Sequence, residues 1–531
     1  PSGPKPDALT GLRYTPKTIC KSRKNNYYIS GMLKINVISD GRTETVTGER
    51  GSSLLDILRQ SGYEIYAACG GNGRCGKCTV QVKGEGTMLS CSCYPNRDIE
   101  VILPDSRETN ILTSQTEYLS DLPYDGEGRR NLTPQPYGIA VDIGTTTVVL
   151  YFVDLLTGQL AGIASLLNPQ AAYGADVISR ITWCQTHEKG VQELQQAIVA
   201  ALNGEIRKFV AARKLAEENI ERAVIAGNTT MLHMLLGEDP VPIALAPFKP
   251  RFTESQRRTG AATGLAVNEE AEVVTLPSLS AYVGADIIAG LAALSVREKN
   301  YLFLDIGTNG EMAIVTGDEI FACAAAAGPA FEGANLTCGM NASEGAISSF
   351  TRPGEYRVIG NTGPTGICGS GIVDIVAWLT ANGIVDETGF MRDDFVIDDA
   401  MNIRVTQRDI REIQLAKSAI YSGMKILTMR RGLKFSDIDA LFLAGGFGNY
   451  ISIDSALQTG VLPYELAGRI YPVGNSAGIG ALQYLRSKEF VTRTDEIAAR
   501  ARYLELSDDE EFPVEFAMNM EFSNPGRHSF D

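Results

Sequence analysis

Five of the ten cysteines in this 531-residue chain fall between positions 69 and 93, and their spacing suggests metal chemistry. Cys69, Cys75 and Cys78 share the glycine-rich segment ACGGNGRCGKCT, and Cys91 and Cys93 follow in LSCSCYP. Glycine lets a loop wrap closely around a metal cluster because it has no Cβ atom to clash. Three close cysteines with a distant fourth match the plant-type [2Fe–2S] spacing, whereas zinc sites usually show two C-x2-C pairs. The spacing therefore predicts a [2Fe–2S] cluster, with Cys91 or Cys93 as the fourth ligand.

A second motif occurs twice, as IAVDIGTTTVVLYFV at 139–153 and LFLDIGTNGEMAIV at 302–315. An aspartate at the end of a strand can hold Mg²⁺ through water, and the Gly-Thr turn can aim N–H and hydroxyl groups at a phosphate. Two facing hairpins would clamp the phosphates of ATP from both sides. Glu311, shortly after the second turn, is a candidate for orienting water at the γ-phosphate. The predicted contacts are Asp142, Gly144, Thr145 and Thr146 in the first hairpin and Asp305, Gly307, Thr308 and Asn309 in the second.

Three further turns precede predicted helices or follow apolar strands. LFLAGGFGNY (441–450) would let adenine and ribose approach its backbone, and CGSGIVDIV (368–376) offers an anion or ligand contact at a helix start. AGNTTMLHML (226–235) is a third Gly-Asn-Thr loop that could touch nucleotide or partner, and we interpret its His233 as a packed helix residue. The additional predicted nucleotide contacts are Gly369, Ser370, Gly445, Gly446, Phe447 and Gly448.

The elements around the cysteines form a compact pattern. Alternating or apolar runs at 33–39, 42–48, 79–84 and 99–103 predict strands, and SLLDILRQ predicts a helix that Ser52 or Ser53 caps and Gly62 ends. Strands around one helix predict a β-grasp ferredoxin domain at 32–104. Residues 1–31 are basic and lack apolar periodicity, so we exclude them as a disordered arm, a tag or a misassigned start.

The rest of the chain divides at a polar segment. Residues 105–136 are punctuated by Pro and Gly and predict a linker, and 137–531 predict a duplicated α/β ATPase domain of the actin and sugar-kinase type. The repeated hairpin opens each half, at roughly 137–300 and 301–531.

Composition excludes several classes of function. A net charge of −15 argues against a nucleic-acid partner, and three histidines leave little for a histidine-based metal site. No apolar run reaches the ~18 residues of a membrane span. We therefore expect a cytoplasmic protein without membrane or nucleic-acid partners.

The motif set resembles known families. The two hairpins with LAGGFG resemble the superfamily of acetate and sugar kinases, heat-shock chaperones and actin. With the ferredoxin-type segment ahead of them, the chain resembles a narrower family, the ATP-dependent reductive activators of corrinoid proteins, over nearly everything from residue 32. The further segments that carry this resemblance are NPQAAYGADVISRI, AGNTTMLHMLLG, AGPAFEGANLTCGM and GICGSGIVD.

The resemblance implies a function. Such activators return an oxidised corrinoid cobalt from Co(II) to Co(I) with one electron from a [2Fe–2S] cluster, accompanied by ATP and Mg²⁺. It implies that Cys91 is the fourth ligand, that a corrinoid protein is the substrate and that a low-potential donor lies upstream; a homodimer is left open. The alternative we weigh is a small-molecule kinase with a fused redox-sensing ferredoxin domain. A carrier with a degenerate ATPase half and an activator of a radical dehydratase are less favoured.

Overall fold

In a computed structural model of the chain, the described residues are 32–39, 42–61, 63, 78–103, 118–126 and 129–522. They belong to two compact units, 1–106 and 107–531. The predictions for residues 1–31, for Cys69 and Cys75 and for much of the linker fall outside the described residues. Among the helices of the described residues, none is long and apolar enough to cross a membrane.

The first unit is a mixed five-stranded sheet with the order β2-β1-β5-β3-β4. β1 pairs antiparallel with β2 and parallel with β5, and its alternate residues Leu33, Ile35 and Val37 are buried. Ser53 caps α1, because its hydroxyl accepts a hydrogen bond from the Asp56 amide at 3.1 Å. β4 and the short 3₁₀ helix Ser90–Ser92 were not predicted from the sequence. The elements are β1 Met32–Ser39, β2 Arg42–Glu49, α1 Leu54–Gln60, β3 Thr79–Val82, β4 Gly86–Leu89 and β5 Ile99–Ile102.

The second unit contains two six-stranded sheets, each built around one of the repeated hairpins. The first has the order β10-β11-β9-β6-β7-β8 and the second β21-β20-β12-β13-β14-β22. The first sheet comprises β6 Tyr137–Ile143, β7 Thr147–Asp154, β8 Leu160–Leu167, β9 Ile220–Gly227, β10 Gln256–Thr259 and β11 Glu272–Thr275. The second comprises β12 Asn300–Ile306, β13 Gly310–Thr316, β14 Glu319–Ala325, β20 Ala440–Ala444, β21 Ile470–Gly474 and β22 Ala501–Tyr503.

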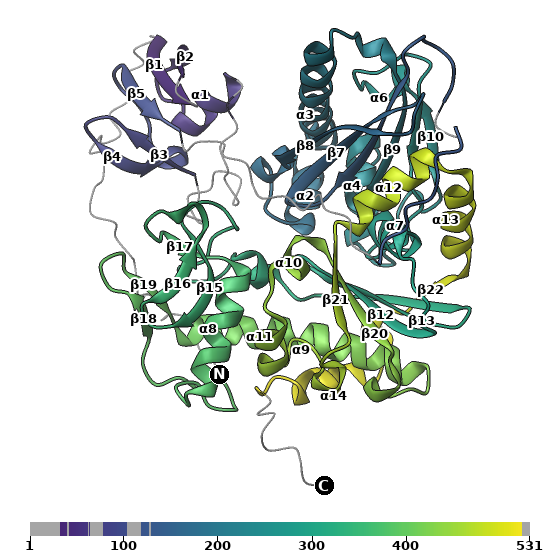
Figure 1. Cartoon of the computed structure of the whole chain (residues 1–531). Helices are drawn as coiled ribbons and strands as arrows, with labels where there is room; N and C mark the ends of the chain where they lie inside the picture. Colours follow the sequence, from purple (N-terminus) through teal and green to yellow (C-terminus); the bar gives the residue numbers. More distant parts are fainter. Residues whose placement is uncertain are drawn as a thin grey trace, which may run out of the picture. The chain divides into compact units, whose positions relative to one another are not determined.

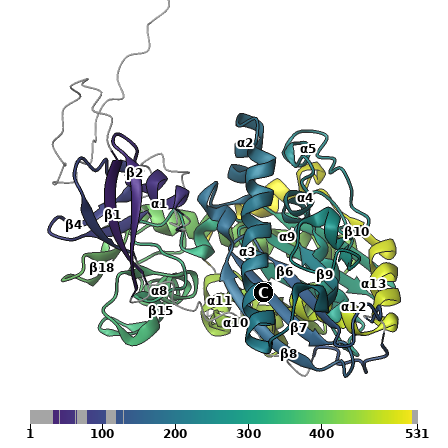
Figure 2. The ribbon, with the colours of Figure 1, turned by 90° about the horizontal axis from the view of Figure 1, so that it is seen from above.

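Helices cover both faces of the first sheet. Phe152 of β7 stacks on Phe209 of α3, with ring centroids 4.0 Å apart, and α3 runs along this sheet in Figure 2. The neighbouring Tyr151 points to the opposite face, where it packs against Gly478 of α12 (Ser476–Arg486). The helices of this half are α2 Val177–Thr186, α3 Gly190–Arg213, α4 Thr229–Leu236, α5 Val241–Ala244, α6 Gly260–Thr263 and α7 Ala285–Ala293.

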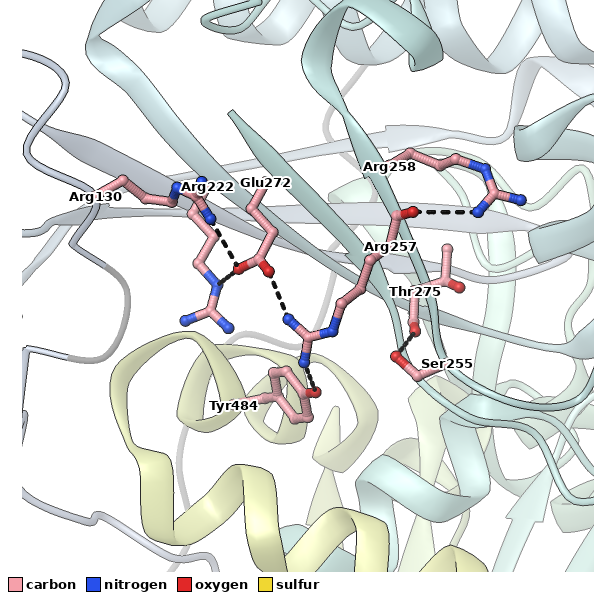
Figure 3. A network of polar contacts seen from close by, with 8 residues as sticks. All are labelled: Arg130, Arg222, Ser255, Arg257, Arg258, Glu272, Thr275 and Tyr484. Carbon is pink, nitrogen blue, oxygen red and sulfur yellow. Dashed lines mark hydrogen bonds and ion pairs between the residues drawn. The ribbon is translucent and has the colours of Figure 1, made fainter. Parts of the chain in front are cut away.

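Two helices from the end of the chain return to the first half of this unit. Figure 1 shows both in yellow: α12 (Ser476–Arg486) packs on β6 and β9 of the first sheet, and α13 (Lys488–Arg500) packs on α7. From the sequence, both belong to the predicted second half. A polar network ties α12 to the sheet (Figure 3). Glu272 of β11 lies 3.0 Å from Arg222 of β9 and 2.5 Å from Arg257 of β10, and Arg257 donates to the Tyr484 hydroxyl of α12 at 3.4 Å.

α7 lies between the two sheets. Gly290 of α7 touches both Phe303 of β12 and Ser476 of α12, and every residue of α7 but Asp286 is buried. A helix that is apolar on all sides fits such a position. The far face of the second sheet packs on α9, since Met312 of β13 meets Gly423. The remaining elements are β15 Ala346–Arg352, β16 Glu355–Val358, β17 Gly366–Ile367, α8 Gly369–Ala381, β18 Phe395–Asp398, β19 Ile403–Val405, α9 Gln407–Arg430, α10 Gly445–Tyr450, α11 Ile453–Thr459 and α14 Phe512–Met518.

The segment before β6 is attached to the second unit. Residues 118–126 and 129–136, which the sequence analysis counts as linker, are hydrogen bonded along it. The Ser120 amide donates to Ala293 at 2.7 Å, and the Glu221 carboxylate accepts from the Thr133 amide at 2.6 Å.

Candidate functional site

The two predicted hairpins are alike in outline, but their turns close one residue apart. β6 ends at Ile143 and β7 begins at Thr147, and the Gly144 amide closes the turn on the Thr147 carbonyl at 2.9 Å. In the second hairpin the Gly307 amide closes on the Asn309 carbonyl at 2.9 Å. Both turns therefore present their threonine hydroxyls at the end of a central strand.

Parallel neighbours bring other turns to the same strand ends. β9 runs parallel to β6 and leads into Asn228, whose side-chain amide donates to the Thr145 hydroxyl at 3.0 Å. β20 runs parallel to β12 and leads into Gly445. A Cβ on Gly445 would lie 2.4 Å from Asp305 Oδ1, and its φ of +77° also favours glycine, so this turn depends on that residue type.

These strand ends line one cavity of about 320 Å³. Apart from Gly448, every predicted nucleotide-contacting or catalytic residue lines it. Gly448 lies within α10 and packs against Leu443 of β20. The predicted residues at the cavity are Asp142, Gly144, Thr145, Thr146, Asp305, Gly307, Thr308, Asn309, Glu311, Gly369, Ser370, Gly445, Gly446 and Phe447.

Five acidic side chains line the cavity, and for Asp142, Asp286, Asp305 and Glu311 burial dominates the electrostatics. Burial, with Asp286 and Asp305 nearby, raises the pKa of Asp142 to about 8, although a hydrogen bond from Asn475 opposes the rise. Burial and the charge of Asp286 raise the pKa of Asp305 to about 7, and burial raises that of Asp286 itself to about 6. Burial and the charges of Asp286 and Asp305 raise the pKa of Glu311 well above its ordinary value. Such carboxyls favour a bound cation, which would offset their mutual repulsion.

The arrangement fits a hydrated cation. In the described part of the chain no three His, Cys, Asp or Glu side chains are grouped to hold a metal directly. Mg²⁺ usually keeps several waters and takes one or two carboxylates plus substrate phosphates. The carboxylates therefore suit Mg²⁺ that arrives with a nucleotide.

Sequence reasoning missed several polar residues at the cavity, among them Asp286, Asn475 and Glu332. Asp286 opens α7, Asn475 caps α12, and Glu332 ends the 3₁₀ helix Pro329–Glu332. None belongs to the repeated motif, and packing between elements brings them to the cavity. The one local signal was the Gly-Ala-Asp and Gly-Asn-Ser turns that precede two helices rich in small residues.

His233 lies away from this chemistry. It is fully buried in α4, where its ring stacks on Phe252 at 4.1 Å and bonds Thr229 and the Arg251 amide. Burial lowers the pKa of His233. This placement agrees with the interpretation of a packed helix residue.

In the first unit the described cysteines Cys78, Cys91 and Cys93 all belong to the buried core. Cys78 precedes β3, and its carbonyl accepts from the Ser90 amide at 2.8 Å, which places the 3₁₀ helix with Cys91 beside it. Burial raises the pKa of the Cys78 thiol, and the side chain of Cys91 is near enough to affect it. The Cys93 carbonyl accepts from the Leu54 amide of α1 at 2.7 Å. A thiol pair of this kind suits two ligands of one cluster.

Comparison with known proteins extends this picture. Family models match three segments: "2Fe-2S iron-sulfur cluster binding domain" at 37–96, "RACo middle region" at 137–299 and "C-terminal domain of RACo the ASKHA domain" at 299–531. Together they account for the ferredoxin-type unit and for both hairpin-bearing halves.

Relatives match over most of their length. The corrinoid activation enzyme RamQ of Eubacterium limosum is 32% identical, over 91% of this chain and 98% of that protein. The [Co(II) methylated amine-specific corrinoid protein] reductase of Methanosarcina barkeri is 25% identical, over 71% and 75%. A solved structure of a reductive activator for corrinoid, iron-sulfur protein covers 92% of this chain and 98% of its own, with 28% identity and a TM-score of 0.65. The chain belongs to the RACo family of reductive activators of corrinoid proteins, with an iron–sulfur ferredoxin domain and an actin-like ATPase domain.

Proposed function

We propose that this chain reactivates a corrinoid protein by passing one electron from a [2Fe–2S] cluster to Co(II), with ATP and Mg²⁺ at the cavity of the second unit. One observation carries the proposal: two hairpins with phosphate-type turns and half-buried carboxylates open on one cavity, in a chain that also holds a cysteine-bearing ferredoxin unit.

Different residues of the cavity would bind different parts of the nucleotide. The turn amides and hydroxyls at Gly144–Thr146 and Gly307–Asn309 would hold the phosphates. Asp142 and Asp305 would hold Mg²⁺ through water, and Glu311 would orient the attacking water. Gly445, Gly446 and Phe447 would receive adenosine, with Gly369 and Ser370 beside them at the start of α8.

The contacts of Phe447 support this role. Its ring stacks on Phe331 with centroids 5.0 Å apart, and a Cβ at Gly369 would lie 1.7 Å from the Phe331 carbonyl. Only glycine at 369 lets α8 begin against this aromatic pair, which forms an apolar wall for a base.

In the first unit, Cys69, Cys75, Cys78 and Cys91 would hold the cluster, which when bound supplies a one-electron carrier. Plant-type clusters have potentials of about −400 mV, and each 100 mV of uphill transfer costs about 2.3 kcal/mol. Nucleotide can assist such a transfer if it binds the complex with the corrinoid partner in one conformation more tightly than in another.

Anaerobic visible spectroscopy tests the proposal. The protein is mixed with a Co(II) corrinoid protein and a low-potential reductant, which stands for the upstream donor, with and without Mg·ATP. A Co(I) band that grows only with nucleotide supports it. A Co(I) band that grows equally without ATP, or no Co(I) under any condition, contradicts it.

The kinase alternative makes a different prediction, a phosphorylated acceptor. Radiolabelled ATP with candidate acceptors would reveal one, whereas the proposed reaction releases phosphate to water. A cytoplasmic location and the absence of nucleic-acid and membrane partners also belong to the proposal, whereas a homodimer is left open. Sedimentation with and without Mg·ATP tests the oligomeric state.

A further inference from the structure

A carboxylate links the two phosphate-type hairpins. The Thr146 hydroxyl of the first hairpin donates to Glu332 Oε1 at 3.2 Å, and the Thr308 hydroxyl of the second donates to Glu332 Oε2 at 2.8 Å. Glu332 lines the cavity and takes no part in the proposed function as stated above. Each of its two oxygens is therefore bonded to a different half of the ATPase domain.

These contacts use the atoms that a phosphate would need. A threonine hydroxyl has a single proton to donate. In this arrangement the protons of Thr146 and Thr308 are both given to Glu332, so neither hydroxyl can donate to a phosphate oxygen until the carboxylate releases it. A carboxylate and a phosphate are both anionic acceptors, so each can take the place of the other at such donors.

The surroundings hold the carboxylate in place. Burial raises the pKa of Glu332, while the two hydroxyls and the positive charge of Arg180 oppose the rise. Arg180 is fully buried and donates to the Thr145 carbonyl of the first hairpin at 2.6 Å. Behind Glu332 the chain is constrained, because a Cβ on Gly333 would lie 2.0 Å from the Met340 carbonyl.

The same segment also reaches the adenosine turn. Phe331, adjacent to Glu332, is the residue that stacks on Phe447. Two consecutive side chains thus contact the first hairpin, the second hairpin and the GGFG turn.

We propose that Glu332 is a built-in competitor for the phosphate site, whose carboxylate occupies the two threonine hydroxyls until the β- and γ-phosphates of the nucleotide displace it. This inference rests on the proposed nucleotide site. Displacement would free the Pro329–Glu332 segment and so report the presence of a polyphosphate to the neighbouring Phe331 and Phe447. Adenosine monophosphate, which lacks the phosphates that reach the hairpins, would leave the carboxylate in place.

Binding of three nucleotides tests the proposal. Isothermal titration of the full-length protein with Mg·ATP, Mg·ADP and AMP is compared for wild type, Glu332→Gln and Glu355→Gln. We expect Glu332→Gln to bind Mg·ATP roughly tenfold more tightly, since the glutamine removes the competing negative charge. Its AMP affinity should equal that of wild type, because AMP lacks the phosphates that reach the hairpins. A variant that had merely lost structure would instead bind all three nucleotides more weakly. Glu355, an exposed residue of β16, is the matched control and should change none of them.

Other outcomes separate the two claims. Unchanged or weaker Mg·ATP binding by Glu332→Gln, with normal binding by wild type, overturns the competitor. Failure of wild type to bind any of the three nucleotides overturns the proposed site and this inference with it. If Glu332→Gln does not fold, Glu332→Asp keeps the charge but is too short to reach both hydroxyls. It should bind Mg·ATP several-fold more tightly than wild type, and equal or weaker binding overturns the proposal.

Discussion

At the residue scale, the half-buried carboxylates of the cavity are where a substitution should act most strongly. Asp305 lies at the end of β12, beside Gly445 and facing the cavity that Asp142 and Asp286 share. We expect Asp305→Asn to lower Mg²⁺-dependent ATP hydrolysis by roughly 100-fold or more, since it removes a preorganised charge from the metal site. Phosphate release measures the effect. Asp318→Asn, at an exposed turn, is the control, and hydrolysis by Asp305→Asn near the wild-type rate would remove Asp305 from the metal site.

The fourth cluster ligand is a second question at this scale. Cys91 approaches Cys78, whereas the backbone of Cys93 is bonded to α1. We expect Cys91→Ser to lose most of the iron and the visible absorption of the purified protein, and Cys93→Ser to keep both. Iron content and absorption spectra measured side by side decide the point. The opposite pattern would assign the ligand to Cys93.

The sequence predicts a site residue only where that residue belongs to a recognisable local motif. Asp142 and Asp305 were predictable because each precedes a glycine turn within its own hairpin, and the motif repeats. The sequence could not predict Asp286, Glu332 and Asn475. Each lies on a separate turn, and packing between segments that are distant in sequence brings that turn to the cavity. Gly448 packs on Leu443 and does not line the cavity, and in sequence such a packing glycine looks the same as one that contacts nucleotide.

At the element scale, the close approach of α7 and α12 depends on glycine. A Cβ on Gly480 of α12 would lie 2.3 Å from the Ala289 carbonyl of α7, and backbone atoms there cannot easily move aside. We expect Gly480→Ala to lower the free energy of unfolding by about 1–3 kcal/mol. Urea denaturation followed by fluorescence measures it.

A matched glycine provides the control for that helix pair. Gly204 lies in the middle of α3 with nothing within 4 Å of its Cβ position. Gly204→Ala should therefore raise the free energy of unfolding by about 0.5–1 kcal/mol, as alanine does in an open helix position. If both variants shift stability by the same sign and size, the α7–α12 contact is not as tight as the structure indicates.

At the scale of the whole molecule, the sequence predicted the division into a ferredoxin-type unit and a duplicated ATPase unit, because two different kinds of local motif mark them. It did not predict that α12 returns from the end of the chain to β6 and β9 of the first sheet, or that α13 packs on α7. These partners lie far earlier in the chain, and local pattern carries no information about such contacts.

The two units also allow the whole molecule to be tested with two independent signals. Both tryptophans, Trp183 and Trp378, lie in the second unit, so intrinsic tryptophan fluorescence reports its unfolding, while the cluster's visible absorption reports the first. A ligand at 100 times its Kd stabilises the state that binds it by about 2.7 kcal/mol. Mg·ATP should therefore raise the midpoint of the fluorescence transition and leave the loss of cluster absorption where it was, because the apolar core of the first unit contains no residue of the cavity. AMP at 100 times its own Kd serves as the control, and it should also raise the midpoint of the fluorescence transition. If Mg·ATP moves both transitions equally, the two units unfold together, and the nucleotide acts on a structure that includes the iron–sulfur domain.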